Sequence, residues 1–139
     1  MSKEILLFVY GSLRKNSSHN HLLQSGVWMF EGKTKGKLFL IDWYPGMIVP
    51  SGDNHEDFHD EWVLGDVYRV SMPLLLQLDT YEGPGYDRGL ILVYDKNQVA
   101  HQTQVYIYNQ NVENKKRICP ADWVEYTKTH HVPKPDPSA

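Results

Sequence analysis

A glutamate beside a Gly-Pro-Gly turn is the residue best suited to acid–base chemistry in this chain. Glu82 follows leucines at helical spacing, and the sequence 83–85 (Gly-Pro-Gly) prevents the helix from continuing. A carboxylate there lies near the negative end of the helix dipole, which disfavours ionisation and raises its pKa. If Tyr81 and Tyr86 enclose it, Glu82 becomes a candidate general base near neutral pH.

Two readings of this segment stay open. Tyr86 and Arg88 are two residues apart, so on a strand they point to the same face and could both contact a ligand. Alternatively, Glu82 is a solvated turn carboxylate and Arg88 is its surface partner, an arrangement that is common at helix ends.

A second candidate segment follows the first apolar run of the chain. Residues 5–9 (Ile-Leu-Leu-Phe-Val) predict a buried strand, and the Gly11-Ser12 pair after it predicts a sharp turn. Turns at strand ends present N–H groups that can hold a carboxylate or an oxyanion. By itself the segment Tyr10-Gly11-Ser12-Leu13 could equally be a turn without function.

The elements that must position these residues are mostly strands. Apolar patterns predict strands at 5–9, 47–49, 62–70, 90–94 and 104–108, and a longer one within 27–43 with a bend or bulge at Gly32 and Gly36. Ser71 is a typical N-cap and predicts a short helix over 72–80, whereas Pro120 is expected to open a last helix. Tyr44-Pro45-Gly46 is typical of a turn.

This pattern predicts a small α+β domain whose sheet curls into a barrel. We find no internal repeat and no linker, so we expect one domain over residues 1–132. The segment 133–139, in which prolines alternate with other residues, is expected to be a disordered tail.

Composition disfavours several classes of function. The 139 residues carry a net charge of -3 without a basic stripe, so nucleic acid is not a favoured partner. Apolar runs stay far below the roughly 20 residues needed to cross a membrane. The N-terminus lacks the pattern of a secretory signal, and the single Cys119 cannot form an internal disulfide. We therefore expect a cytoplasmic protein without membrane or nucleic-acid partners, and the oligomeric state stays open.

Five segments occur in a defined order along residues 5–108. They are Val9-Tyr10-Gly11-Ser12-Leu13, Tyr44-Pro45-Gly46, Gly65-Asp66-Val67-Tyr68, Leu78-Asp79-x-Tyr81-Glu82-Gly83 and Tyr86-x-Arg88. Their order and spacing resemble those of the γ-glutamylcyclotransferase-like family, which includes the AIG2-like proteins.

The resemblance implies a small mixed β-barrel flanked by short helices, with a pocket between the first loop and the glutamate after the helix. In enzymes of the family that glutamate is the general acid/base, a role that corresponds to Glu82. The reaction releases 5-oxoproline and an amine or amino acid, and it needs no metal or organic cofactor. The implied binding residues for the γ-glutamyl substrate are Tyr10, Gly11, Ser12, Leu13, Tyr44, Pro45, Tyr86 and Arg88.

The residues suit that chemistry. A γ-glutamyl compound carries its own nucleophile, the α-amine, and its own electrophile, the γ-carbonyl. Ring closure therefore needs positioning, which can remove about 7–11 kcal/mol of barrier, more than it needs an enzymic nucleophile. One carboxylate can take a proton from the α-ammonium and return one to the leaving amine. A non-catalytic module that binds a small molecule in the same pocket is the alternative function.

Two segments depart from the expected pattern of the amine-specific branch. Residues 16–21 (Asn-Ser-Ser-His-Asn-His) replace a short glycine-containing turn, and the loop 51–60 is acidic and contains histidines. Because loops at the mouth of a pocket recognise the leaving group, its identity stays open. Trp43 could pack at the barrel edge or line the pocket.

The sequence 55–59 (His-Glu-Asp-Phe-His) matches the H-E-x-x-H pattern of zinc proteases. That chemistry needs both histidines on one face of a stable helix. The segment is rich in acidic residues and lacks apolar helical periodicity, so we interpret it as a solvated loop and expect no metal.

Overall fold

The computed structural model describes residues 5–50 and 57–130, which form eight strands and three helical segments. In chain order these are β1 (Ile5–Val9), the 3-10 helix η1 (Asn20–Leu23), β2 (Val27–Lys35), β3 (Lys37–Leu40), β4 (Pro45–Ile48), β5 (Trp62–Val70), α1 (Met72–Glu82), β6 (Tyr86–Tyr94), β7 (Ala100–Tyr108), β8 (Lys116–Ile118) and α2 (Trp123–Thr129).

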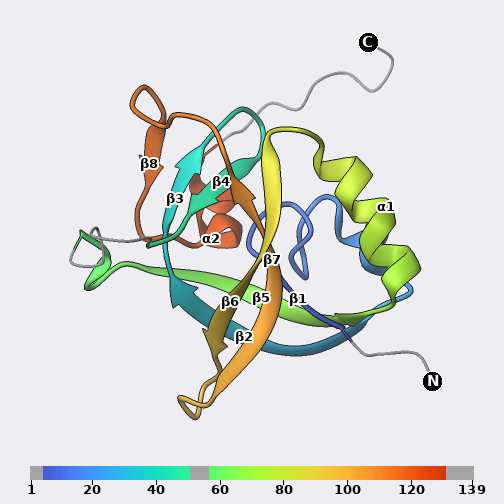
Figure 1. Ribbon diagram of the computed structural model, residues 1–139. Coiled ribbons are helices and arrows are strands. Elements are labelled where there is room, and N and C mark those ends of the chain that lie inside the picture. The colour runs from blue at the N-terminus through green and yellow to red at the C-terminus, as the bar shows by residue number, and fades with distance from the viewer. Residues whose placement is uncertain (1–4, 51–56, 131–139) are drawn as a thin grey trace.

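Five of the strands form a closed barrel in the order β1-β5-β2-β6-β7 (Figure 1). The first strand closes it, because β1 runs antiparallel to β5 and parallel to β7. In the parallel pair, Leu7 lies opposite Gln104 and Phe8 lies opposite Val105. The predicted α+β class and mixed barrel are therefore confirmed.

A smaller sheet with the strand order β4-β3-β8 packs beside the barrel. Within it, Pro45 pairs with Leu40 and Gly46 pairs with Phe39, so the prediction of a turn at 44–46 is wrong from Pro45 onward. The proline is tolerated because β4 is an edge strand, where one backbone N–H can be missing without breaking an inner ladder. The strand places Pro45 against the loop that follows β1.

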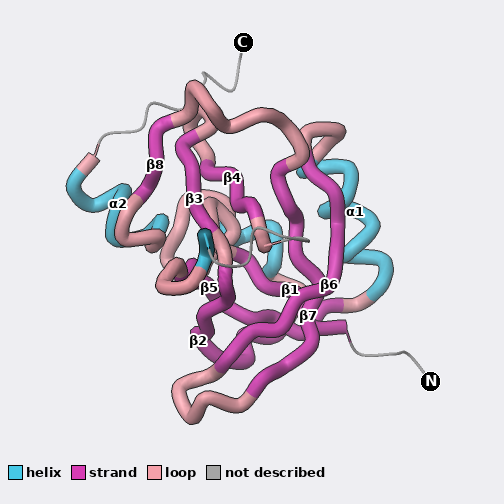
Figure 2. Tube along the Cα trace, turned by 60° about the vertical axis from the view of Figure 1, so that its left-hand side comes forward, coloured by secondary structure: helices cyan, strands magenta, loops and turns pink. Residues whose placement is uncertain are grey.

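The helices α1 and α2 lie on opposite sides of the molecule in Figure 2.

The ends of α1 follow from its sequence. Its N-cap, Ser71, accepts a hydrogen bond from the backbone N–H of Leu74 at 3.2 Å, as expected from its residue type. The helix α1 continues two residues beyond its predicted end and stops at Gly83, whose φ of 78° suits glycine. Glu82 is thus the last residue of α1.

The prediction that Pro120 opens the last helix is wrong. The helix α2 begins at Trp123, because the side chain of Asp122 caps it by accepting a hydrogen bond from the backbone N–H of Glu125. Pro120 follows a cis peptide bond and lies in the connection from β8, a strand that sequence reasoning missed. Cys119, in the same connection, is exposed.

The strands of the barrel match their predictions to different degrees. The bounds of β1 and β5 are as predicted, whereas β6 and β7 are longer and pair along their whole length. Gly36 separates β2 from β3, as the expected bend requires. The bulge lies between Trp28 and Phe30 rather than at Gly32, which instead packs against Val93.

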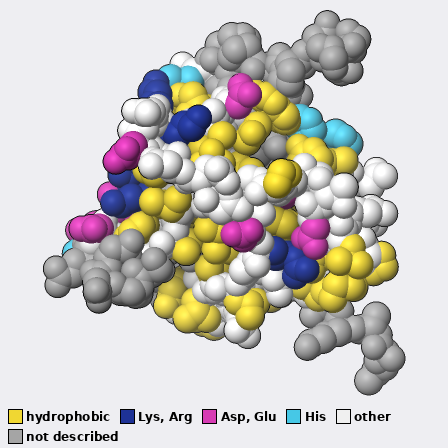
Figure 3. All heavy atoms as spheres, turned by 45° about the horizontal axis from the view of Figure 1, so that its top comes forward, with side chains coloured by type: hydrophobic (Ala, Val, Ile, Leu, Met, Phe, Trp, Pro, Cys, Tyr) yellow, Lys and Arg dark blue, Asp and Glu magenta, His cyan; other side chains and the backbone are white. Residues whose placement is uncertain are grey.

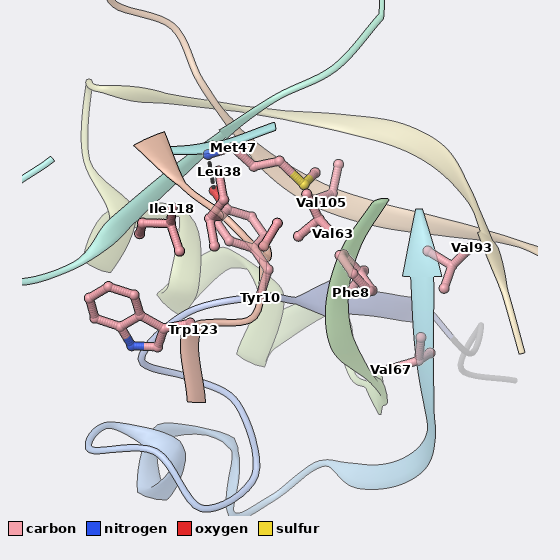
Figure 4. Close-up of a cluster of buried hydrophobic side chains, with 11 residues drawn as sticks. Phe8, Tyr10, Leu38, Met47, Val63, Val67, Val93, Val105, Ile118 and Trp123 are labelled. Atoms are coloured by element: carbon pink, nitrogen blue, oxygen red, sulfur yellow. Dashed lines mark hydrogen bonds between the residues drawn. The ribbon is translucent and has the colours of Figure 1, made fainter. Parts of the chain in front are cut away.

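Two clusters of buried side chains form the core. Figure 4 shows the first, in which Tyr10 lies between Met47 and Ile118 on one side and Phe8 on the other. The second cluster joins β1 to α1 through Leu7, Leu75 and Leu78. Both clusters contain residues next to the loop that follows β1, so the core fixes both ends of that loop.

On the face shown in Figure 3, lysine and arginine side chains lie close to aspartate and glutamate side chains, with hydrophobic side chains between them. None of the helices within residues 5–50 and 57–130 is long and apolar enough to cross a membrane. The predicted tail at 133–139 and the histidine and glutamate at positions 55 and 56 lie outside the described residues.

Candidate functional site

A cavity of about 170 Å³ opens between the loop after β1, the start of β4 and the end of α1. Five separate segments of the chain supply its walls. The lining residues are Phe8, Val9, Tyr10, Gly11, Ser12, Leu13, Trp43, Tyr44, Pro45, Tyr81, Glu82, Tyr86 and Tyr106.

Glu82 is the one acidic residue among these lining residues, and burial raises the pKa of its carboxyl group to about 7. Glu82 lies at the last position of α1, where the helix end predicts a raised pKa. The structure identifies burial as the cause. Near neutral pH such a carboxyl group can both accept and return a proton.

The loop after β1 lines the cavity and contains backbone N–H groups without an acceptor among the described protein residues. In the described part of the chain, the N–H groups of Gly11, Ser12 and Leu13 donate no hydrogen bond to a protein acceptor. The loop is nevertheless fixed, because Arg14 N–H donates to the Gly11 carbonyl at 3.0 Å and His19 N–H donates to the Ser12 carbonyl at 2.8 Å. Fixed, unpaired N–H groups are the elements of a carboxylate or oxyanion site.

Gly11 allows the loop to approach β4 closely. A Cβ atom at this position would lie 2.7 Å from Cγ of Pro45, a distance that side chains do not tolerate. The glycine is thus required by the close packing of two cavity walls rather than by an unusual φ.

Tyr10 and Tyr86 line the cavity with their rings, whereas their hydroxyl groups bind the protein itself. Tyr10 donates to the Tyr106 carbonyl at 2.6 Å and accepts from the Met47 N–H at 3.3 Å. Tyr86 donates to the Pro45 carbonyl at 2.8 Å. Burial raises the pKa of both phenols, so both stay protonated at neutral pH. These tyrosines tie the cavity walls together.

Arg88 is not among the residues that line the cavity, although its motif places it near Tyr86. Its guanidinium binds both carboxylate oxygens of Asp79, at 2.8 and 3.2 Å, and also reaches Gln104. Asp79 also accepts from the Tyr106 hydroxyl at 2.7 Å. Partial burial would raise the pKa of Asp79, but the hydrogen bonds from Arg88 and Tyr106 lower it overall. This pairing braces the last turn of α1, which ends at Glu82, and the contact of Arg88 with substrate stays a prediction.

A charge cluster around the buried Arg14 holds the other end of the loop. Arg14 is 4% exposed, and its guanidinium contacts Asp66 of β5 at 3.1 Å and the cap residue Asp122 at 2.9 Å. Glu31 of β2 contacts it at 3.2 Å. The backbone N–H of Lys15 donates to Asp66 as well. The loop is therefore clamped to two barrel strands and to α2.

Most residues expected from the sequence meet in one place. The cavity brings together Glu82 and seven of the eight predicted binding residues: Tyr10, Gly11, Ser12, Leu13, Tyr44, Pro45 and Tyr86. Trp43 also lines the cavity, which is one of the two positions expected for it, the other being the barrel edge. Sequence reasoning missed Tyr106, whose residue type in an ordinary β-strand gives no signal.

Comparison with known proteins places the chain among its relatives. The family described as "Gamma-glutamyl cyclotransferase, AIG2-like" matches residues 7–125. The chain belongs to this family. The matched range covers the barrel, the cavity and the start of α2, so this γ-glutamylcyclotransferase-like protein keeps the family's core elements.

Its relatives include proteins of different lengths. YkqA of Bacillus subtilis (strain 168) is 29% identical over 122 residues, which cover 87% of this chain but 42% of YkqA. The chain thus spans less than half of that relative. The γ-glutamylcyclotransferase family protein YtfP of Escherichia coli O157:H7 is 27% identical over 129 residues, which cover 88% of this chain and 98% of YtfP.

Solved structures share the fold. The crystal structure of YkqA superposes with a TM-score of 0.73 at 26% identity, over 93% of this chain and 44% of that one. An AIG2-like protein from Mus musculus gives a TM-score of 0.65 at 22% identity, over 80% of this chain and 81% of that one. At this identity the mouse structure supports the fold alone.

Proposed function

We propose that this protein cyclises a γ-glutamyl amine or γ-glutamyl amino acid to 5-oxoproline, with Glu82 as the general acid/base. One observation carries the proposal. A carboxyl group whose pKa is raised to about 7 lines the same cavity as a loop with three unpaired N–H groups. Family membership and the names of the relatives support the same class of reaction.

The first half of the proposed reaction forms the ring. The ionised Glu82 accepts a proton from the substrate's α-ammonium group, and the freed amine attacks the γ-carbonyl carbon. A new C–N bond closes the five-membered ring, and the carbonyl oxygen becomes an oxyanion. Removing one donor from such an oxyanion site typically costs about 3–4 kcal/mol, so N–H groups from Gly11 to Leu13 can contribute substantially.

The second half releases the leaving group. The oxyanion collapses, the bond to the leaving nitrogen breaks, and that nitrogen takes the proton held by Glu82. The ring nitrogen still carries a second proton, which passes to the released amine, so the products are 5-oxoproline and an ammonium ion, and Glu82 is ionised again. Since the nucleophile belongs to the substrate, the cavity needs only to orient it and to let protons move from the α-nitrogen to the leaving nitrogen.

The proposed base predicts the pH dependence of the reaction. Because Glu82 must be ionised and its pKa is about 7, kcat/KM for 5-oxoproline formation should reach about half its maximum near pH 7 and level off about one pH unit higher. It should fall about tenfold per pH unit well below pH 7. A kcat/KM profile between pH 4 and 8 tests this. An acid limb near pH 4.5, the value of an ordinary glutamate, would contradict the assignment.

The alternative, a binding module without turnover, predicts a different result for the same mixtures. The protein would bind γ-glutamyl compounds in calorimetry, and mass spectrometry would detect no 5-oxoproline. The raised pKa of Glu82 favours the enzyme, because an ionisable group near neutrality is needed for proton transfer and not for binding alone.

A further inference from the structure

Three rings from distant parts of the chain meet beside the cavity. The His19 ring lies 5.0 Å from the Trp43 ring and 6.0 Å from the Tyr81 ring, measured between centroids. Trp43 lies between β3 and β4, Tyr81 is in the last turn of α1, and His19 precedes η1. Trp43 and Tyr81 also line the cavity, so the ring group borders the space that holds Glu82.

These rings are not part of the hydrophobic core. Neither cluster of buried side chains includes any of them, and Tyr81 is 40% exposed. Aromatic rings that line a cavity and keep accessible surface are suited to contacting a ligand, because a ring placed against them gains burial and stacking.

The ring group is attached to the loop that is proposed to hold the γ-glutamyl group. His19 N–H donates to the Ser12 carbonyl at 2.8 Å, and the Ser12 side chain lies near enough to Tyr81 to offset part of the rise that burial causes in the pKa of its phenol. A substrate whose γ-carbonyl lies against this loop would direct its leaving group toward the three rings.

The charges near the rings disfavour an anionic leaving group. Among the described residues that line the cavity, none is lysine or arginine, and Glu82 is the acidic one. The ring group itself contains His19, and the His21 ring lies 5.9 Å from the His19 ring, so the comparison with an anionic leaving group is made at a pH where ordinary histidine is neutral. Asp42 lies close enough to Tyr44 to raise the pKa of its phenol further. A leaving group with its own carboxylate would lie near these acidic side chains, and no lysine or arginine among the described lining residues could pair with it. Burying such an unpaired carboxylate is costly.

We propose that His19, Trp43 and Tyr81 form a leaving-group subsite that selects amines carrying an aromatic ring, an inference that rests on the proposed function. Cyclisation of such substrates should exceed that of the same γ-glutamyl group on a small alkylamine, and that of an aromatic amino acid. Three compounds separate the effect of the aromatic ring from the effect of the carboxylate: γ-glutamylphenethylamine, γ-glutamylethylamine and γ-glutamylphenylalanine.

The test compares kcat/KM for 5-oxoproline formation at pH 8, where ordinary histidine is neutral and Glu82 is ionised. We expect the phenethylamine compound to exceed the ethylamine compound by about 10- to 100-fold, from ring burial and stacking. It should exceed γ-glutamylphenylalanine, which differs only by the carboxylate, by about tenfold or more. Nearly equal values for the first pair, with measurable turnover, would overturn the subsite and leave the proposed function standing.

Substitutions of the ring residues test whether the rings cause the preference for the phenethylamine compound. His19→Ala and Trp43→Ala should each lower the phenethyl-to-ethyl ratio at least about threefold, whereas His19→Phe should retain it. His101→Ala is the matched control, because His101 also packs on a ring, Phe30 at 4.6 Å, but does not line the cavity. An unchanged ratio in folded His19→Ala and Trp43→Ala would overturn the assignment.

Failure of the proposed function gives a separate result. If none of the three compounds yields 5-oxoproline, calorimetry on the same wild-type protein compares their affinities. Binding of γ-glutamylphenethylamine at least about tenfold tighter than γ-glutamylethylamine would support the subsite. Equal affinities, or no binding, would overturn it.

Discussion

Replacing Glu82 by glutamine is expected to reduce kcat for 5-oxoproline formation by about 10²- to 10⁴-fold, the usual contribution of a general acid/base. Glutamine has nearly the same shape, so the cavity walls and the loop after β1 should keep their positions. The amide can neither accept the α-ammonium proton nor supply one to the leaving amine. Substrate affinity, measured by calorimetry, should change much less than kcat.

The same substitution should leave the protein at least as stable as the wild type. A carboxyl whose pKa rises from 4.5 unfolded to about 7 folded favours the native state when protonated. That contribution is fully present below about pH 4.5 and is lost as the pH rises through 7. At pH 8 the wild type therefore carries a cost on the order of 1–3 kcal/mol, which glutamine removes. Thermal unfolding of Glu82→Gln should occur at an equal or higher temperature.

The matched control for this variant is Glu113→Gln, because Glu113 is exposed and does not line the cavity. It should leave both kcat and the unfolding temperature unchanged. If Glu82→Gln retained wild-type turnover, the proposed acid–base role would be wrong, whatever the protein's substrate.

Replacing Arg14 by methionine is expected to lower the free energy of unfolding by about 3–5 kcal/mol, the usual cost of breaking a buried ion pair. Asp66 is 3% exposed and would lose its guanidinium partner, while Asp122 would lose an ionic contact at the start of α2. Methionine fills much of the same space, so the effect would arise mainly from the uncompensated charge. Urea unfolding at pH 7 measures it.

An exposed ion pair supplies the control. Lys128 pairs with Glu125 on the surface of α2, where water screens the pair, so Lys128→Met should leave stability nearly unchanged. Adding Asp66→Asn to Arg14→Met should recover part of the loss, because the unpaired buried charge is then removed. A loss in Arg14→Met as small as that in the control would show that the cluster does not hold the loop.

The sequence was informative where local patterns determine structure. The apolar run 5–9 and the alternation over 62–70 set the bounds of two barrel strands, and Ser71 and Gly83 set the limits of α1. The Tyr10–Leu13 loop and Glu82 came together as the resemblance implied, because β1 and α1 pack in one core cluster.

Other features depend on contacts that are distant along the chain. Pro45 became part of a strand because β4 lies at a sheet edge, which a turn-forming tripeptide cannot reveal. Arg88 bound Asp79 rather than facing the cavity, although its position in the motif suggested a ligand contact. The ion cluster around Arg14 joins residues from four separate segments of the chain, so no single segment of sequence could indicate it.

The most direct test of the central claim is mass-spectrometric detection of 5-oxoproline from purified wild-type protein with a panel of γ-glutamyl amines and γ-glutamyl amino acids. We expect 5-oxoproline and free amine in equal amounts from at least one compound, and almost none from Glu82→Gln assayed in parallel. Binding of panel members without 5-oxoproline from any of them would contradict the claim.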